Sequence, residues 1–500
     1  MSIAEAYHAL TKYTEDNVRS GPELDWSLQP AQFKQIVSQN RVSLRSYLPV
    51  RLPGQDAGTP VGGTHESLAR LSRLLYFGNG LTGLIRYGPG QGQFLRAAPS
   101  AGALYPTETY VAVRDLPGLA PGIYNYQVPT HDLVLLWDDD PFNELKAACG
   151  DAARFDETGL CLIFTGVFWR SAWRYQERGY RRVLLDTGHV LSNLVAYAPE
   201  VSATAHPHLG FVDPAVNGPF FFDDAVEGVL ACVPITDGES PALPGPLWAS
   251  ATGDGGSLKA ATIGDESDLA ASATVALHRA SSCWESLPAV AMEHREAQVS
   301  ERSIPLAAPT AFDVPKVILR RRSARSYSGA SIPLDALGQV LGYSLGRADG
   351  TRTFRLATRD AGLLGCHVVV LDVDGLDQGL YAVEGAGEAL LPLAMGSFRE
   401  RLFHLSLGQE IAQRCAAIVV YTAPADESIT AYGDRAYRYL HVEAGMAGQR
   451  LQLAAQAHGI GACGIGGFFD DEAATLVDCN ANDFVLYLVT IGRPSDRPAG

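Results

Sequence analysis

The stretch that decides the fold occurs twice in the chain, as Tyr175-Gln-Glu-Arg178-Gly-Tyr180-Arg181 and as Tyr432-Gly-Asp-Arg435-Ala-Tyr437-Arg438. Each matched residue is displaced by 257 positions. The same displacement brings Gly122 onto Gly379 and Tyr124 onto Tyr381. Self-similarity at one fixed displacement indicates an internal duplication. The 500 residues therefore predict two copies of one domain rather than a single large core.

A further match has a different spacing. The string Phe221-Phe222-Asp223-Asp224 resembles Phe468-Phe469-Asp470-Asp471 at a displacement of 247. This spacing predicts that the first copy holds about ten extra residues in a surface loop, where insertions are tolerated.

Both copies have the same expected order of elements. Apolar β-branched runs predict strands over 109–113 and 160–165 in the first copy, and over 367–371, 416–422 and 484–491 in the second. The stretch after each tyrosine-arginine motif predicts a helix that is apolar on more than one side, which favours burial between domains; a core helix inside one domain is the alternative. The fold class is therefore α+β.

The segment between the copies, 237–261, is rich in Gly, Pro, Ser and Ala and predicts a linker, and 268–285 predicts a helix. We expect a first domain with an N-terminal extension over 1–237, a linker with its helix over 238–310, and a second domain over 311–500. Tandem copies often replace a symmetric homodimer, so the two are expected to form an intramolecular pseudo-dimer with shared sites.

Composition narrows the class of partner. With 55 acidic and 39 basic residues, the net charge of -16 repels phosphate backbones and anionic lipids, so we expect neither a nucleic-acid nor a membrane partner. Residues 1–17 lack the apolar core of a secretory signal, which predicts a cytoplasmic protein. Eight scattered cysteines predict buried free thiols, and His206 and His208 lack nearby ligands in the sequence, so no metal is assigned.

Several runs are candidate ligand-binding segments. Residues 320–325, Arg-Arg-Arg-Ser-Ala-Arg, concentrate guanidinium groups that suit phosphate oxygens, although a solvated basic helix start is the alternative. Arg493 follows a predicted strand and would add a cation. The run 459–468 is rich in glycine, which permits close approach of a ligand to the backbone or simply forms a turn. In the first copy, the small residues of 98–106 let a flat ring approach, whereas the corresponding 358–362 has lost both prolines.

A set of motifs spread over both halves shares its order with one known family. The most specific is Pro99-Ser100-Ala101-Gly102-Ala103-Leu104-Tyr105-Pro106, and the others include Tyr7-His8, Leu24-Asp25-Trp26, Gln29-Pro30, Gly122-Ile-Tyr124, Arg174-Tyr175 and Asp186-Thr-Gly188-His189. Together they resemble the SagB/ThcOx-type dehydrogenases of the FMN-dependent nitroreductase superfamily. The resemblance implies two tandem nitroreductase-like domains, each with an antiparallel-rich sheet flanked by helices.

The resemblance also implies where a single FMN binds, because the flavin of that superfamily lies at a dimer interface. The expected cofactor-binding residues are Arg321, Arg322, Ser323, Arg325, Gly466, Gly467 and Arg493 from the second copy and Pro99, Ser100, Ala101 and Gly102 from the first. The pseudo-symmetric second site would use 40–45, 358–362 and 206–211, where the motifs are degenerate, and is predicted to be empty.

The family's reaction is the oxidation of a thiazoline or oxazoline in a modified peptide to the aromatic azole, with hydride passing to FMN and the electrons onward to oxygen. A proton must also leave, and Tyr175 and Arg174 are the candidate catalytic residues. Arg174 stands where the family has lysine. Arginine stays protonated, but its charge would stabilise a Tyr175 phenolate and lower the pKa of the phenol. A structural role for Tyr175 and Arg178 is the alternative, because Tyr432 and Arg435 repeat them.

Three functions follow as hypotheses. The leading one is an FMN-dependent azoline oxidase in natural-product biosynthesis, with a small heterocyclic or peptide substrate and a cyclodehydratase or carrier protein as partner. A second is NAD(P)H-dependent reduction of nitro or quinone compounds. The third is a non-catalytic flavin-binding or scaffold subunit of a peptide-modifying complex.

Overall fold

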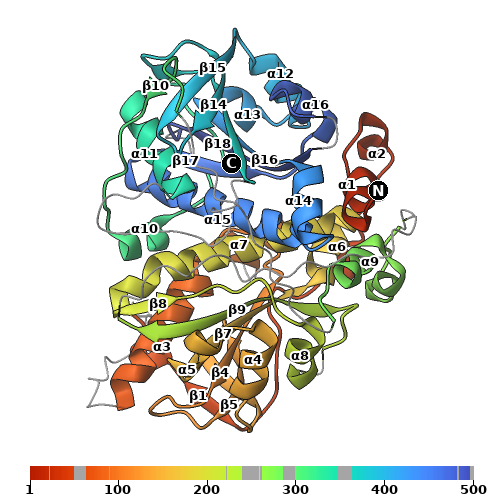
Figure 1. Ribbon diagram of the computed structural model, residues 1–500, viewed down its shortest axis with the longest axis vertical. Coiled ribbons are helices and arrows are strands. Elements are labelled where there is room, and N and C mark those ends of the chain that lie inside the picture. Colours follow the sequence, from red (N-terminus) through yellow and green to blue (C-terminus); the bar gives the residue numbers. More distant parts are fainter. Residues whose placement is uncertain are drawn as a thin grey trace. The chain divides into compact units, whose positions relative to one another are not determined.

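The computed structural model describes residues 1–21, 23–49, 64–88, 91–220, 222–238, 258, 262–284, 299–346, 363–480 and 483–495. The chain divides into two compact units (Figure 1). The first-copy unit comprises Asp25–Ala251 and Ala261–Val290, and the second-copy unit comprises Met1–Leu24, Thr252–Ala260 and Ala291–Gly500. Most of the predicted linker 237–261 and all of 358–362 lie outside the described residues.

The first-copy unit is built on a seven-stranded sheet with the strand order β1-β6-β5-β4-β7-β9-β8, in which every neighbouring pair is antiparallel. Strands β4 and β7 confirm the predictions from β-branched runs. Strands β2 and β3 form a separate two-stranded antiparallel hairpin, which precedes β4 in the sequence. The strand bounds are β1 Arg41–Ser43, β2 Leu81–Gly88, β3 Gln91–Arg96, β4 Thr107–Val113, β5 Gly122–Gln127, β6 Asp132–Trp137, β7 Leu160–Val167, β8 Ala203–Ala205 and β9 Glu227–Asp237.

The second-copy unit repeats this sheet in the order β10-β15-β14-β12-β16-β18-β17, again with antiparallel neighbours only. Strand β14 begins and ends 257 residues after β5, so the duplication is confirmed in topology as well as in sequence. The short strands β11 and β13 form a separate parallel pair. The bounds are β10 Ile304–Pro305, β11 Ile332–Pro333, β12 Gly365–Val370, β13 Val373–Asp374, β14 Gly379–Glu384, β15 Ala389–Met395, β16 Ala417–Ala423, β17 Gly461–Ile465 and β18 Phe484–Gly492.

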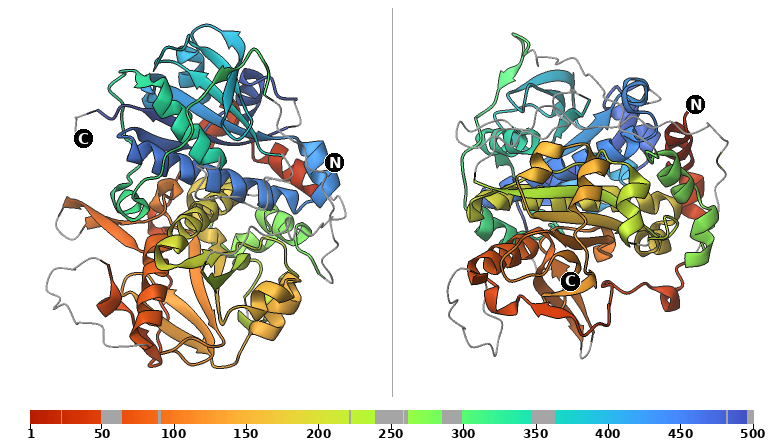
Figure 2. Two further views of the ribbon diagram at one scale, coloured as in Figure 1. Left: turned by 60° about the vertical axis from the view of Figure 1, so that its left-hand side comes forward. Right: turned by 60° about the horizontal axis from the view of Figure 1, so that its bottom comes forward.

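Helices cover both faces of each sheet, as Figures 1 and 2 show from different sides. The first-copy unit holds α3 Thr64–Asn79, α4 Phe142–Cys149, α5 Ala152–Asp156, α6 Phe168–Tyr175, α7 Gly179–Tyr197, α8 Asp213–Asn217 and α9 Ala273–Ala280. The second-copy unit holds α1 Ile3–Leu10, α2 Glu15–Arg19, α10 Val314–Arg320, α11 Leu334–Leu345, α12 Arg399–Leu405, α13 Glu410–Arg414, α14 Ala425–Tyr432, α15 Ala436–Ala457 and α16 Asp470–Leu476.

Alternation along β4 divides its side chains between two layers. Tyr110 packs with Phe142 of α4 and Phe155 of α5 in the core on one face. On the other face, the Thr107 hydroxyl lies 3.0 Å from that of Thr187 on α7. The expected helix after the tyrosine-arginine motif is α7, and every residue in it except Val195 is buried. The predicted α+β class, with an antiparallel-rich sheet flanked by helices, is therefore confirmed for each copy.

The leading helix of each sequence copy packs in the other copy's unit. Helix α1 lies in the second-copy unit, where His8 Nδ1 is 3.1 Å from the Tyr437 hydroxyl. Helix α9, which precedes the second copy in sequence, lies in the first-copy unit, where His278 Nδ1 is 2.8 Å from the Tyr180 hydroxyl. Because Tyr437 is the repeat of Tyr180, the two leading helices occupy equivalent places and are exchanged between the copies.

The segment after each leading helix corrects the predicted displacement of 247. The Tyr13 amide donates to Asp470 Oδ2 at 3.0 Å, and the Cys283 amide donates to Asp213 Oδ2 at 2.8 Å. Asp470 and Asp213 each begin a helix, α16 and α8, and they are 257 residues apart. The string at 468–471 therefore corresponds to 211–214 and not to 221–224, so no ten-residue insertion separates the copies here. The prediction of an insertion was wrong because the two Phe-Phe-Asp-Asp strings resemble each other without being equivalent in the fold.

Candidate functional site

The Pro99–Gly102 segment is anchored to helix α7 in the first-copy unit. Ser100 Oγ donates to Asp186 Oδ2 at 2.5 Å and accepts from the Tyr105 amide at 2.8 Å. The Ala101 amide also faces Asp186, at 3.3 Å from both carboxylate oxygens. Ser100 thus closes its own turn while the buried Asp186 fixes the turn to the helix. Sequence reasoning quoted Asp186 but gave it no role.

The backbone of this turn is strained. Gly102 has a φ of 61°, and the non-glycine residues Ala103 and Tyr105 also have positive φ, 53° and 50°. The left-handed conformation costs an L-residue about 1–2 kcal/mol, so two such residues within one turn need support from their surroundings. Strain of this kind concentrates at functional sites, which makes the segment a candidate on backbone geometry as well as on sequence.

The structure brings both predicted catalytic residues to Gly102. A Cβ atom placed on Gly102 would lie 2.9 Å from the Tyr175 hydroxyl and 3.3 Å from Arg174 Cδ. Tyr175 is half-buried and Arg174 is exposed. Residues some 70 positions apart in the sequence are thus neighbours at the end of α6, and only a residue without a side chain fits between them and the turn.

A second cation stands near the same phenol. The guanidinium carbon of Arg182 lies 5.4 Å from the centroid of the Tyr175 ring, and that of Arg174 lies 5.9 Å from it. Arg182 is buried on α7, one turn before Asp186. Sequence reasoning missed Arg182, although its i, i+4 spacing with Asp186 on one helix was an available signal.

The chain reverses direction directly after Tyr175 through an unusual residue. Gln176 has φ 50° and ψ −142°, a region that glycine tolerates far better than other residues. The matched residue in the second copy is a glycine, Gly433, with φ 59° and ψ −153°. In the first copy the Gln176 carboxamide is held by Ile263, accepting from its amide at 2.8 Å and donating to its carbonyl at 3.1 Å. The loop before α9 therefore supports the strained position next to Tyr175.

The matched tyrosine of the second copy has different surroundings. Tyr432 is completely buried, and this burial raises the pKa of its phenol. Tyr175, in contrast, is half-buried beside an exposed glycine. The repeat conserves the residue type but not the environment of the hydroxyl group.

The predicted phosphate motif follows helix α10 in the second-copy unit. Arg321 caps this helix and is buried, with Nη1 3.5 Å from Gln452 Oε1. The chain then runs beside β17, where the Ala324 amide donates to the Ala462 carbonyl at 2.9 Å. Burial raises the pKa of the Cys463 thiol on β17, and the positive charges of Arg325 and Arg321 oppose that rise. The charges of two of the predicted guanidinium groups are therefore close enough to β17, the strand of the glycine-rich run, to affect the pKa of its thiol.

Arg493 lies at the same edge of the unit. Its carbonyl accepts from the Ser328 amide at 2.9 Å, and its Nε donates to the Ser331 carbonyl at 2.6 Å. Arg322 is exposed and folds back on α10, where its Nη1 donates to the Arg321 carbonyl at 2.7 Å. The structure thus collects the arginine motif, β17 and Arg493 from three distant parts of the sequence.

Close packing explains part of the glycine-rich run. A Cβ atom on Gly464 would lie 1.9 Å from the Tyr487 hydroxyl, and one on Gly461 would lie 3.1 Å from Ala324 Cβ. Gly466 and Gly467 lie just beyond β17, and the Gly467 carbonyl accepts from Gln409 Nε2 at 3.2 Å. The glycines within β17 serve the fold, which leaves Gly466 and Gly467 as the candidates for close approach to a ligand.

The whole architecture has a counterpart among solved structures. The chain matches a nitroreductase-family protein from Anabaena variabilis over 99% of its own length and 100% of the other chain, with 33% identity and a TM-score of 0.85. The family model described as "Nitroreductase family" matches residues 318–493, within the second copy. The chain belongs to the nitroreductase family. The predicted resemblance is therefore confirmed at the level of the family, whose members are generally flavin-dependent oxidoreductases.

Two relatives of this nitroreductase-family chain are named as processing proteins. The trifolitoxin-processing protein TfxB of Rhizobium leguminosarum bv. trifolii is 37% identical over 115 residues, which are 21% of this chain and 30% of TfxB. The microcin B17-processing protein McbC of Escherichia coli is 28% identical over 135 residues, 25% of this chain and 48% of McbC. The matches thus span less than half of either relative. They support the SagB-type resemblance predicted from the sequence.

Three further histidines of this family member, His189, His206 and His208, are buried. His189 Nδ1 lies 3.2 Å from the Pro99 carbonyl oxygen, so it supports the turn described above. Burial lowers the pKa of His206 and His208 to about 4. All eight cysteines are free thiols. Among the described residues, no group of three or more His, Cys, Asp and Glu side chains is arranged to hold a metal ion.

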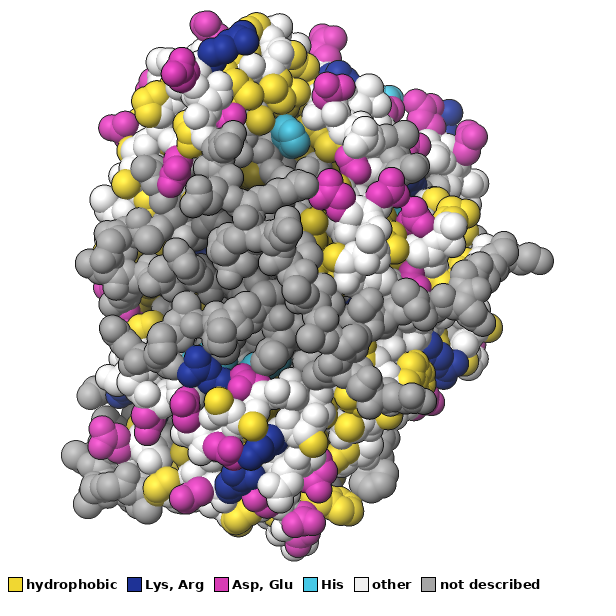
Figure 3. Space-filling model, in the orientation of Figure 1, with side chains coloured by type: hydrophobic (Ala, Val, Ile, Leu, Met, Phe, Trp, Pro, Cys, Tyr) yellow, Lys and Arg dark blue, Asp and Glu magenta, His cyan; other side chains and the backbone are white. Residues whose placement is uncertain are grey.

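The surface reflects the net charge. Acidic side chains are scattered over the described surface of the face in Figure 3, interspersed with Lys and Arg. No helix in the part of the chain that the structure describes is long and apolar enough to cross a membrane.

Proposed function

We propose that this nitroreductase-family chain is an FMN-dependent oxidase that converts an azoline in a peptide-derived substrate to the aromatic azole. The observation that supports this most directly is the Tyr175 hydroxyl beside Gly102, with the guanidinium groups of Arg174 and Arg182 at 5.9 Å and 5.4 Å from the centroid of the same ring. Similarity to two proteins named for the processing of trifolitoxin and microcin B17 supports the class of substrate.

The proposed FMN-binding residues are those expected from the sequence. In the second copy they are Arg321, Arg322, Ser323, Arg325, Gly466, Gly467 and Arg493, and in the first copy Pro99, Ser100, Ala101 and Gly102. The donor set suits a phosphate, because guanidinium groups gathered at one edge of an acidic protein form charge-assisted bonds to phosphate oxygens. When bound, FMN would supply the acceptor for the two electrons that leave the azoline as hydride, and oxygen would take them up afterwards.

The chain's own contribution is removal of the proton. A guanidinium does not accept a proton near neutral pH, so neither Arg174 nor Arg182 is the base. Nearby positive charge favours an ionised phenol, so Tyr175 is the proton acceptor in this proposal. Gln176 and the anchored turn at Ser100 would hold the phenol in place.

The test is Tyr175→Phe, with Tyr432→Phe as the matched control from the other copy. General-base catalysis typically contributes about 10²–10⁴-fold, so Tyr175→Phe should lower azoline oxidation at least about 100-fold without loss of bound flavin. Tyr432→Phe should keep its activity. Full activity of Tyr175→Phe with normal flavin content would remove the proposed base.

A second candidate function is NAD(P)H-dependent reduction of nitro or quinone compounds, which the family match favours. Rapid bleaching of the bound flavin by NAD(P)H, together with no oxidation of an azoline, would establish that function instead. For the leading proposal we also expect a cyclodehydratase or carrier-protein partner that delivers the modified peptide, as the similarity to McbC suggests.

A further inference from the structure

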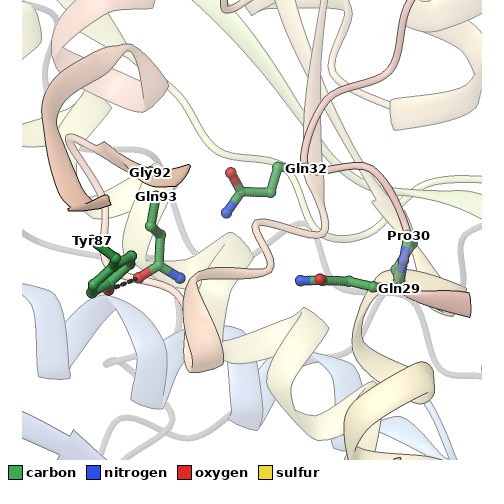
Figure 4. A pocket seen from close by; sticks show the side chains of 6 residues that line it. All are labelled: Gln29, Pro30, Gln32, Tyr87, Gly92 and Gln93. Carbon is green, nitrogen blue, oxygen red and sulfur yellow. Dashed lines mark hydrogen bonds between the residues drawn. The ribbon is translucent and has the colours of Figure 1, made fainter. Parts of the chain in front are cut away.

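The first-copy unit contains a cavity of about 410 Å³ that the proposed reaction does not use. It lies between the segment 29–32 and the hairpin β2–β3 (Figure 4). Its volume is within the roughly 300–1,000 Å³ that is typical of ligand sites. The residues that line it are Gln29, Pro30, Gln32, Tyr87, Gly92 and Gln93.

The part of the lining that the structure describes is polar and carries no charged side chain. Three side chains are carboxamides, and the Tyr87 hydroxyl donates to Gln93 Oε1 at 3.0 Å, as the dashed line in Figure 4 marks. A carboxamide both donates and accepts hydrogen bonds, which matches the N–H and C=O groups of a peptide backbone. A dinucleotide cofactor, in contrast, brings phosphates that call for cations, and none of the described residues that line the cavity is Lys, Arg or His.

The cavity is tied directly to the strained turn. Gln32, one of its lining residues, donates from Nε2 to the Ala103 carbonyl at 2.6 Å, and Ala103 is next to Gly102. The buried Arg96 donates from Nη2 to the Gln32 carbonyl at 2.7 Å, and its amide donates to the Tyr105 hydroxyl at 3.2 Å. One hydrogen-bonded network therefore connects the cavity wall with Ala103 and Tyr105, in the second half of the turn that lies beside Tyr175.

The cavity is also accessible within its own unit. Tyr87 is 67% exposed, and Gln29 is exposed as well. Gln32 thus links Ala103, the neighbour of Gly102, to the cavity that these two residues also line.

We propose that this cavity is a subsite for an uncharged peptide segment that flanks the reacting heterocycle. The role of the reacting heterocycle rests on the proposed function. Binding of the peptide segment in the cavity can be tested separately. Gln32 is a positioning residue of the turn, so the test uses the other carboxamides.

The experiment compares the full-length chain with the double variant Gln29→Leu, Gln93→Leu, and with Gln39→Leu as a control for an exposed glutamine outside the cavity. The substrates are a capped, amidated six-residue peptide with one central thiazoline and a thiazoline amide without flanking residues. Loss of two hydrogen bonds should raise KM for the peptide about tenfold, with kcat unchanged. The small thiazoline should be oxidised as before. An unchanged KM for the peptide, or an equal loss for both substrates, would overturn the subsite.

A binding measurement separates failure of the subsite from failure of the oxidase proposal. A capped, uncharged hexapeptide without an azoline is titrated by calorimetry into the same three proteins. We expect about tenfold weaker binding to the double variant than to the wild type and Gln39→Leu, even if no azoline is oxidised. Equal binding to all three, or no binding to the wild type, would overturn the subsite.

Discussion

At the scale of single residues, the candidate site depends on the absence of a side chain at Gly102. The segment 99–102 and the pair Arg174 and Tyr175 could be selected from the sequence because the motif is specific and the tyrosine recurs in the repeat. That the two parts meet could not be predicted, because it depends on long-range folding. Asp186 and Gln176 were missed for the same reason: Asp186 contacts Ser100, which is remote in the chain, and Gln176 has a strained backbone and contacts the remote Ile263. Arg182 lies only seven residues after Tyr175, and its spacing with Asp186 could have pointed to it.

Gly102→Ala should show whether activity depends on the space between Gly102 and Tyr175 or only on the stability of the fold. The new Cβ would lie 2.9 Å from the Tyr175 hydroxyl, and we expect oxidation to fall at least about tenfold, because small displacements of a reacting group are costly. Gly238→Ala is the matched control, because Gly238 has a similar φ of 71° but no atom of the described residues within 4 Å of the added Cβ. Both variants should lose about 1 kcal/mol of unfolding free energy. Equal activity of the two variants would contradict the placement of Tyr175.

At the scale of elements, the sequence predicts the main strands and the helix after each motif well, because β-branched runs and the repeat agree. The sequence does not reveal that the leading helix is repeated too. His8 and His278 are 270 residues apart rather than 257, and α1 and α9 share little else, so a comparison at the displacement of 257 does not align the two helices. The false match at 247 had the opposite cause, since a short string recurred by chance.

The exchanged helices give a prediction of their own. Glu177 accepts from the Thr274 amide at 2.9 Å at the start of α9, and Asp434 accepts from the Ala4 amide at 2.7 Å at the start of α1. Glu177→Gln and Asp434→Asn should each cost about 1–3 kcal/mol of unfolding free energy, because buried charge-assisted bonds are lost. Urea unfolding measures this loss, with the exposed Glu144→Gln as control. If the two variants are as stable as the control, these carboxylates do not hold the exchanged helices.

At the scale of the whole molecule, the buried histidines predict how stability depends on pH. Burial lowers the pKa of His131, His206 and His208 to about 4, below the ordinary value of 6.5, so the folded first-copy unit keeps them neutral. Their contribution is complete above pH 6.5 and is lost as the pH falls from 6.5 to 4, because the unfolded chain then binds more protons.

We therefore expect the free energy of unfolding, measured by urea titration, to fall between pH 7.5 and pH 5 by on the order of 1 kcal/mol for each histidine, and the urea midpoint to fall with it. The double variant His206→Gln, His208→Gln should lose less over the same range. Relief of repulsion in a chain of net charge -16 would act in the other direction, so a midpoint that rises on acidification would contradict this account.

In the proposed function, two unequal copies serve one flavin, with the phosphate held by the second copy and the ring platform supplied by the first. The most direct measurement is the ratio of FMN to chain in purified protein, from the absorbance spectrum, for the wild type and for Arg322→Ala. We predict one FMN per chain in the wild type and weakened FMN binding in Arg322→Ala. Two FMN per chain, no uptake of FMN, or unchanged affinity in the variant would contradict the claim.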